Sequence, residues 1–415
     1  MSKCTVLLLL LAVAVWHPAA LAAPLVKTGA QVLHDGGYVE LGCKRVGLIT
    51  NHTALVEGTH LIDLMHRSGK VRLAAIFAPE HGLRGLEEDG VQIGEGVDER
   101  TGVQVYSLYG KTKKPAPEML RDLDLLVFDI QDIGSRFYTY ISTMGLAMQA
   151  AAEAHIPFVV LDRPNPLGGD YVSGFAVQEG FGSFVGQYPI PVAHGLTIGE
   201  LALMIKGERM LPGLEGLDLR VIRQSGWHRG MRWPENGLTW IRTSPNIPDY
   251  ETALIYPGLC FLEATTASEG RGTLEPFRVA GMTDVTTVEL IAKLNGWNLP
   301  GVKFESAVFT PRSIPGMCSR PKYRGRVVSG VRLVITNPAA YRPVETGVFL
   351  LSAFYSSLDK GKREEFFKRE GFDRLAGTDI LRRAIQEGMA PEEIVAAWGA
   401  DVQRFEEKRR RYFLY

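Results

Sequence analysis

The sequence predicts an α/β protein with a doubly wound, mostly parallel sheet and a second, smaller α+β domain. Short apolar segments alternate with helix-like segments through the first two-thirds of the chain. These strand-like segments are apolar almost throughout, which is typical of a parallel sheet covered on both faces. The alternation restarts at Thr283, so we expect the second domain to begin there.

The expected strands of the first domain are short and rich in Val, Leu, Ile and Phe; they cover residues 45–50, 71–77, 103–108, 124–130, 157–161 and 217–222. Helices are expected at residues 59–67, 117–121, 138–154 and 197–206. Thr197 and Glu200 have the Thr-x-x-Glu spacing of a capping box, which marks the start of the last of these helices. Residues 226–281 carry few regular signals, and loops of that length are usually functional.

The second domain begins with a predicted helix at residues 285–294. Strands are expected at 302–309 and 326–336, followed by helices at 344–358, 378–387 and 391–411. No solenoid-type repeat is visible.

Residues 1–22 have the pattern of a secretory signal peptide. Lys3 supplies the positive start, residues 6–15 are apolar, and Ala20 and Ala22 offer a cleavage site. We therefore expect an exported protein, periplasmic or secreted, without a membrane anchor. The expected domains of the mature chain are residues 23–282, which form the catalytic domain, and residues 283–415.

The composition is that of an ordinary globular protein, with 46% hydrophobic and 22% charged residues. Lys plus Arg (46) equals Asp plus Glu (46), so nothing indicates a nucleic-acid-binding protein. Three cysteines follow the predicted signal peptide: Cys43, Cys260 and Cys318. Since three cannot all pair, we expect small buried hydrophobic residues there.

Polar residues gather where the predicted strands end. In open α/β sheets, ligands bind beyond the carboxyl ends of the strands. The residues that follow five successive apolar segments are therefore candidates for a site: Asn51, Glu80, His81, Arg84, Asp129, Asp132, Arg136, Tyr138, Arg163, Asn165 and His194. The alternative is that these loops are polar because they cap helices.

Two carboxylates at one rim suit the hydrolysis of a glycoside, in which one acts as proton donor and the other as base, nucleophile or charge stabiliser. Glu80 is the first candidate acid because it directly follows a strand. Asp129, Asp132 and Glu269 are candidate partners. Asp129 and Asp132 could instead hold Arg136 or Arg163 in place. His81 and His194 could bind a ring hydroxyl or orient a carboxylate, or be structural.

The long loop adds Asn246, Glu269 and Arg271 to the candidates. Arg271 lies between two glycines and could present its guanidinium to a carboxylate. Three tryptophans precede these residues, and they are either platforms for sugar rings or core residues: Trp227, Trp233 and Trp240. No nucleotide or Walker loop, nucleophile elbow or His-Glu-x-x-His motif is present, and no metal-ligand spacing is recognisable, so neither a cofactor nor a metal is expected.

Taken together, these motifs resemble the NamZ-type exo-β-N-acetylmuramidases, formerly a domain of unknown function. The resemblance extends over residues 44–415 and rests on six strings of residues: 77–85, 129–140, 161–166, 193–197, 243–248 and 268–273. It implies a Rossmann-like domain, a smaller α/β domain and an active site between them. It also implies that Glu80, in its Pro-Glu-His-Gly motif, is the catalytic glutamate.

The implied activity is release of N-acetylmuramic acid from the non-reducing end of peptidoglycan fragments during cell-wall turnover and recycling. Because muramic acid carries a lactyl carboxylate, its site should hold a cation, and four arginines are available: Arg84, Arg136, Arg163 and Arg271. Two alternatives remain, a non-catalytic protein that binds cell-wall sugars and an exo-hexosaminidase for another N-acetylated sugar.

Overall fold

The computed structural model describes residues 26–80, 82–83, 96–110, 112–283 and 285–415. Its larger sheet has seven strands in the order β5 (Gly96–Val97), β6 (Gln104–Ser107), β4 (Arg72–Ala78), β1 (Arg45–Thr50), β7 (Leu125–Asp129), β8 (Phe158–Leu161) and β9 (Leu219–Ile222). All neighbouring pairs are parallel except β5 with β6. The predicted fold class is confirmed.

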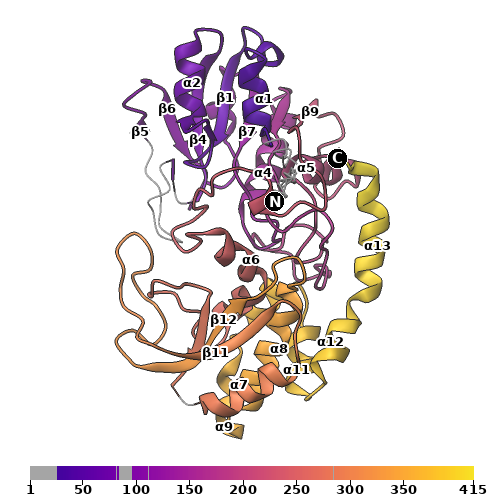
Figure 1. The fold of residues 1–415 in the computed structure, drawn as a ribbon. Coiled ribbons are helices and arrows are strands. Elements are labelled where there is room, and N and C mark those ends of the chain that lie inside the picture. Colours follow the sequence, from indigo (N-terminus) through magenta and orange to yellow (C-terminus); the bar gives the residue numbers. More distant parts are fainter. Residues whose placement is uncertain (1–25, 81, 84–95, 111, 284) are drawn as a thin grey trace, which may run out of the picture.

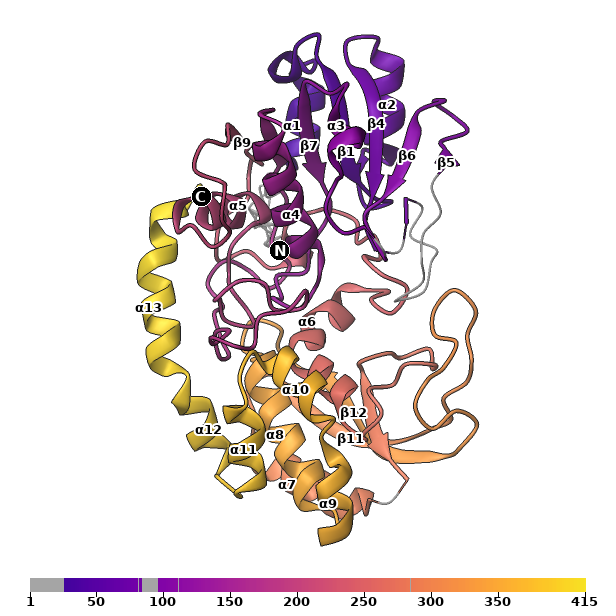
Figure 2. The ribbon, with the colours of Figure 1, turned by 180° about the vertical axis from the view of Figure 1, so that it is seen from behind.

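Helices cover both faces of this sheet (Figures 1 and 2). They are α1 (Gly29–Asp35), α2 (Leu61–Ser68), α3 (Pro117–Leu120), α4 (Tyr140–Glu153) and α5 (Ile198–Gly207). Leu48 packs into one core with the side chains of α1 and α2, whereas Ile49 packs into the core that contains α4 and α5. Successive residues of a strand point to opposite faces, so these strands must be apolar throughout, as the sequence shows. A hairpin of β2 (Leu55–Val56) and β3 (Thr59–His60) follows β1.

The second part contains an antiparallel sheet in the order β10 (Val279–Met282), β12 (Val328–Ile335) and β11 (Val302–Phe309). Its helices are α6 (Tyr250–Leu259), α7 (Thr287–Gly296), α8 (Pro343–Ser356), α9 (Lys360–Phe366), α10 (Arg369–Ala376), α11 (Ile380–Gln386), α12 (Pro391–Ala397) and α13 (Gly399–Arg409). Short 3₁₀ helices complete the chain: η1 (Val39–Leu41), η2 (Trp233–Glu235), η3 (Cys260–Ala264) and η4 (Arg410–Tyr412).

Three local expectations differ from the structure. The segment expected to lack regular structure contains α6, which is buried on nearly every side and therefore has no amphipathic pattern to detect. The helix expected at 391–411 is divided into α12 and α13 at Trp398. Cys260 is buried as expected, but Cys43 is exposed and Cys318 is partly exposed; all three are free thiols.

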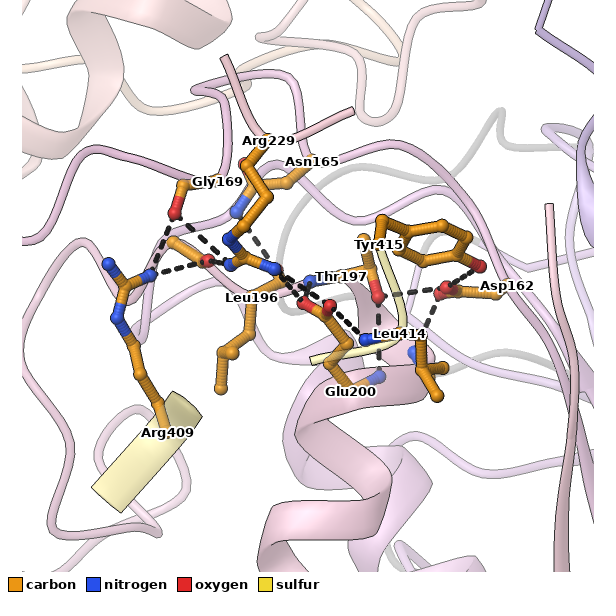
Figure 3. A network of polar contacts seen from close by, with 12 residues as sticks. Asp162, Asn165, Gly169, Leu196, Thr197, Glu200, Arg229, Arg409, Leu414 and Tyr415 are labelled. Carbon is orange, nitrogen blue, oxygen red and sulfur yellow. Dashed lines mark hydrogen bonds and ion pairs between the residues drawn. The ribbon is translucent and has the colours of Figure 1, made fainter. Parts of the chain in front are cut away.

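Helix α13 runs along one side of the molecule and brings the C-terminus back beside α5 and β9 (Figures 1 and 2). There the chain end joins a network of polar contacts, drawn in Figure 3, which we call the C-terminal network: Asp162, Thr197, Glu200, Arg229, Leu414 and Tyr415. Tyr415 Oη donates to Asp162 Oδ2 at 2.7 Å, and the Leu414 amide donates to Glu200 Oε1 at 2.9 Å. The last residues of the chain are thus attached to the first domain. No helix in the described ranges is both long and apolar enough to span a membrane.

Candidate active site

A cavity of about 190 Å³, which we call the Glu80 cavity, has walls from both parts of the chain. Glu80 lies two residues beyond the end of β4, at the carboxyl edge of the larger sheet, and its side chain is half-buried. Thr139, the residue before α4, donates its hydroxyl hydrogen to Glu80 Oε2 at 2.8 Å. One strand end and one helix start therefore fix the position of this carboxyl group.

Aromatic side chains form much of the wall. Tyr138 Oη donates to Thr243 Oγ1 and Tyr140 Oη donates to the Thr243 carbonyl, each at 2.8 Å. The ring of Tyr138 contacts Tyr256 edge-to-face at 5.8 Å, and Tyr256 contacts Phe277 at 4.8 Å. These contacts hold the rings rigidly, and rigid aromatic surface suits the C–H faces of a sugar.

Arg271 and Glu263 border the same cavity as Glu80. Arg271 donates from Nε at 3.2 Å and from Nη2 at 2.8 Å to Glu263 Oε1, and its guanidinium lies 5.0 Å from the Phe277 ring centre. Glu269, one of the predicted site residues, is buried behind this pair; its Oε2 is 2.8 Å from Lys322 Nζ, and its Oε1 is 4.0 Å from Arg271 Nε. Among the described residues, the wall of the cavity thus contains two carboxyl groups and one guanidinium.

Asp129 and Asp132 do not border the Glu80 cavity in the described structure. Asp129 accepts hydrogen bonds from Arg163 Nε at 2.6 Å and from Nη2 at 2.9 Å, so the two form a buried bidentate ion pair. Asp132 Oδ2 accepts from the Gly134 amide at 2.6 Å, and burial raises the pKa of Asp132 to about 7. Holding an arginine was one of the two roles weighed for Asp129, and the geometry fits it.

Arg136 is fully buried, and its guanidinium connects three segments of backbone through hydrogen bonds. Its Nη1 donates to the carbonyls of Phe175 and Ile190, and its Nη2 donates to the carbonyl of Leu375 in α10. Burial lowers the pKa of this guanidinium to about 9. Arg136 therefore joins the two parts of the chain and does not face a ligand.

Three more predicted residues, Asn51, Asn165 and His194, are buried near the sheet edge and make local contacts. Asn51 Oδ1 accepts from the Thr53 amide, and Asn165 Oδ1 accepts from the Leu167 amide. His194 Nδ1 accepts from the Leu196 amide, and burial lowers its pKa to about 3, so the ring is neutral.

The remaining predicted residues have different positions. Tyr138 borders the Glu80 cavity, whereas Asn246 donates from Nδ2 to the carbonyl of Met317 at 2.8 Å. His81 and Arg84 lie outside the described residues. Trp227 is buried against Tyr415, and Trp233 is buried against Trp240; neither borders the Glu80 cavity.

Another cavity, of about 430 Å³, lies near the ends of β1, β7 and β8 and is bordered by Thr53, Gln131, Arg163 and Trp233. Its carboxylate among the described residues is Glu57, which is exposed. Its Arg163 is already paired with Asp129. The Glu80 cavity is smaller, but it has the better set of groups for acid–base chemistry on a sugar. The part of the chain that the structure describes contains no group of His, Cys, Asp and Glu suited to hold a metal ion.

Comparison with known proteins decides the family. Two family models together match most of the chain: exo-β-N-acetylmuramidase NamZ, N-terminal, over residues 46–251, and its C-terminal counterpart over residues 254–415. The chain belongs to the NamZ family of exo-β-N-acetylmuramidases. The predicted family and enzyme class are confirmed.

Individual NamZ relatives agree with this assignment. The chain is 41% identical over 396 residues to the peptidoglycan β-N-acetylmuramidase NamZ of Bacillus subtilis, with 94% of this chain and 92% of that protein covered. Two crystal structures of DUF1343 family proteins from Bacteroides fragilis are also similar. One is 38% identical with a TM-score of 0.84 and the other is 34% identical with a TM-score of 0.76; both cover 94% of this chain and 99% of theirs.

The structure also adds cavity residues that the sequence did not single out for a role, among them Thr139, Tyr256, Glu263 and Phe277. Glu263 lies in η3, within the segment that was expected to lack regular structure. Thr139 occurs in one of the motif strings, but a hydroxyl group in a sequence motif gives no sign of which cavity it borders.

Proposed function

We propose that this NamZ family member hydrolyses the β-glycosidic bond of a terminal N-acetylmuramic acid at the Glu80 cavity, with Glu80 as proton donor. The observation that carries the proposal is that Glu80 and Arg271, far apart in sequence, border one cavity with rigid aromatic walls. A carboxyl group, a guanidinium and aromatic surface are what a carboxylated sugar requires.

The contacts of Glu80 suggest how the proton is delivered. Because Oε2 accepts the hydroxyl hydrogen of Thr139, Oε1 is the oxygen that would carry the proton to the departing sugar. Glu263 is the second carboxyl group among the described wall residues, and a carboxylate at this position can stabilise positive charge on the sugar ring.

Arg271 is the best candidate to bind the lactyl carboxylate. Of the three described arginines considered for this role, Arg136 is enclosed by backbone carbonyls and Arg163 is paired with Asp129. Arg271 borders the cavity, and its contact with Glu263 fixes the orientation of its planar fork.

Glu80→Gln tests the proposal, with Glu57→Gln as the matched control at the other cavity. For a disaccharide of N-acetylmuramic acid and N-acetylglucosamine, Glu80→Gln should lower kcat/KM by about a hundredfold to ten-thousandfold, the range of a general acid. A nitrophenyl muramide needs less protonation of its leaving group, so its loss should be smaller. Glu57→Gln should leave both substrates unaffected.

The alternatives give different results in the same assay. A binding protein would bind the disaccharide without turnover, equally in wild type and in Glu80→Gln. A hexosaminidase for another sugar would cleave the matching glucosaminide faster than the muramide. Equal activity of wild type and Glu80→Gln would remove Glu80 from the mechanism.

We also propose that the protein is exported, periplasmic or secreted. The support is the signal-like pattern of residues 1–22, which lie outside the described structure. Mass spectrometry of the protein purified from its native host should find a chain beginning near residue 23. An intact chain that begins at Met1 would contradict the proposal.

A further inference from the structure

The loop between β11 and β12 is strongly basic in a chain of zero net charge. Residues 310–327, which we call the basic segment, contain five basic residues and no acidic residue: Arg312, Arg320, Lys322, Arg324 and Arg326. No Asp or Glu occurs anywhere between Glu305 and Glu345. Such a local excess of one charge produces a field that attracts anions.

Four of these cations are exposed and have no counter-ion among the residues that the structure describes. Arg312, Arg320, Arg324 and Arg326 are exposed, and none forms an ion pair with another described residue. Most other arginines that approach the cavity or the sheet edge are paired, as Arg271 is with Glu263 and Arg163 with Asp129. An exposed guanidinium without an ion-pair partner can accept a carboxylate without giving up an existing ion pair.

The fifth basic residue, Lys322, attaches the segment to the wall of the Glu80 cavity. Its ammonium donates to the carbonyl of Ala267 at 2.7 Å and lies 2.8 Å from Glu269 Oε2. These two residues lie four and two positions before Arg271, which borders the cavity.

A second attachment is at Gly272, whose carbonyl accepts from the Arg312 amide at 2.8 Å. Gly272 has φ +79°, and a Cβ there would lie 2.6 Å from Pro321, so the close approach requires glycine. In Figures 1 and 2 the loop extends from β11 and β12 toward the larger sheet. The basic segment is therefore attached, at Ala267, Glu269 and Gly272, to the stretch of chain that contains Arg271, a wall residue of the Glu80 cavity.

We propose that the basic segment binds carboxylates on the part of a peptidoglycan fragment that continues beyond the sugar in the cavity. This inference rests on the proposed function, since it places the terminal muramic acid at Glu80. Two sources supply such carboxylates: the lactyl groups of further muramic-acid units and the stem peptides attached to them. The segment would favour longer, anionic fragments over the simple disaccharide.

The test compares R312Q/R320Q/R324Q with the matched control R67Q/K70Q/R72Q, which removes three exposed basic side chains at the opposite, amino edge of the larger sheet. Each protein is assayed at low ionic strength on the disaccharide, on a peptide-free tetrasaccharide and on a tetrasaccharide with a stem peptide on its second muramic acid. The first variant should raise the KM of a tetrasaccharide about five- to tenfold relative to that of the disaccharide. The effect should shrink in 0.5 M salt, because salt screens exposed charges.

The arms separate the possible sources. A rise for the peptide-free tetrasaccharide assigns the lactyl carboxylates, and a rise confined to the peptide-bearing one assigns the stem peptide. R312K/R320K/R324K keeps the charges and should restore most of the preference. Calorimetry on Glu80→Gln gives the same comparison without turnover: the dissociation constant of each tetrasaccharide is divided by that of the disaccharide.

Three outcomes would overturn the inference: an equal change for all three substrates, the same shift in the control, or no difference between the Gln and Lys variants. Binding of a nucleic acid or an anionic lipid without any change in the saccharide ratio would also overturn it. If wild type cleaves none of the substrates, the proposed function fails, and the calorimetric ratio still decides the inference.

Discussion

The C-terminal network and the Glu80 cavity are both rich in carboxylates and guanidiniums, and both lie at the carboxyl edge of the same sheet. In the network, Glu200 accepts hydrogen bonds from Arg229, from the Thr197 amide and from the Leu414 amide, and its side chain is 0% exposed. In the cavity, Glu263 is 30% exposed and borders the same space as Glu80. The same residue types therefore hold the fold together where they are enclosed, and offer chemistry where they border a cavity.

The largest expected effect is on the free energy of unfolding, which should respond more strongly to a substitution in the C-terminal network than to one in the Glu80 cavity. Arg229→Ala leaves the carboxylate of Glu200 buried without its partner, which typically costs about 3–5 kcal/mol of unfolding free energy. Arg271→Ala should cost less than about 1 kcal/mol, because the Arg271–Glu263 pair is partly exposed to solvent. Urea unfolding of both variants measures the difference, and equal losses would erase the distinction between the regions.

The next effect separates the regions by substrate binding. Arg271→Ala should raise the KM for a muramide about tenfold to a hundredfold, the equivalent of one or two charge-assisted hydrogen bonds. A glucosaminide, which lacks the lactyl group, serves as the control substrate and should show little change. Similar increases for the two sugars would remove Arg271 from the carboxylate role.

A third comparison concerns Asp132, which was predicted as catalytic and lies outside the Glu80 cavity. Burial raises its pKa to about 7 from 3.8, so the folded state keeps a proton that the unfolded state releases. This contribution to stability is fully present below pH 3.8 and is lost as the pH rises toward 7. Asp132→Asn removes the titration, so the variant should gain stability relative to wild type between pH 4.5 and pH 8. Urea unfolding at both pH values checks this.

A difference between wild type and Asp132→Asn that does not vary with pH would contradict the burial argument. Kinetics of the same variant sharpen the comparison. If Asp132 belongs with the enclosed groups, kcat/KM should stay within about threefold of wild type, whereas a general acid or base contributes at least a hundredfold.

The regular elements with strong local signals were predictable from sequence. The bounds of β1 and β11 agree with the prediction to the residue, because each strand has an apolar or alternating pattern with clear ends. The Thr197–Glu200 capping box is present at the start of α5 as predicted. Helix α6 was missed, because a helix buried on all sides carries no polar face.

The site was predictable only in part. Glu80 could be placed at the sheet edge because it directly follows a strand, but its meeting with Arg271 depends on how the two parts of the chain pack. Glu263 has no motif around it and became a candidate only through its contact with Arg271. The pairing of Asp129 with Arg163 was one of two open roles, and sequence alone could not choose between them.

The most direct test is a crystal structure of Glu80→Gln with the muramic-acid disaccharide bound. The account predicts that the glycosidic oxygen lies within hydrogen-bond distance of residue 80 and that the lactyl carboxylate contacts Arg271. Density for the sugar in the cavity lined by Thr53, Gln131 and Trp233, with the Glu80 cavity empty, would contradict it.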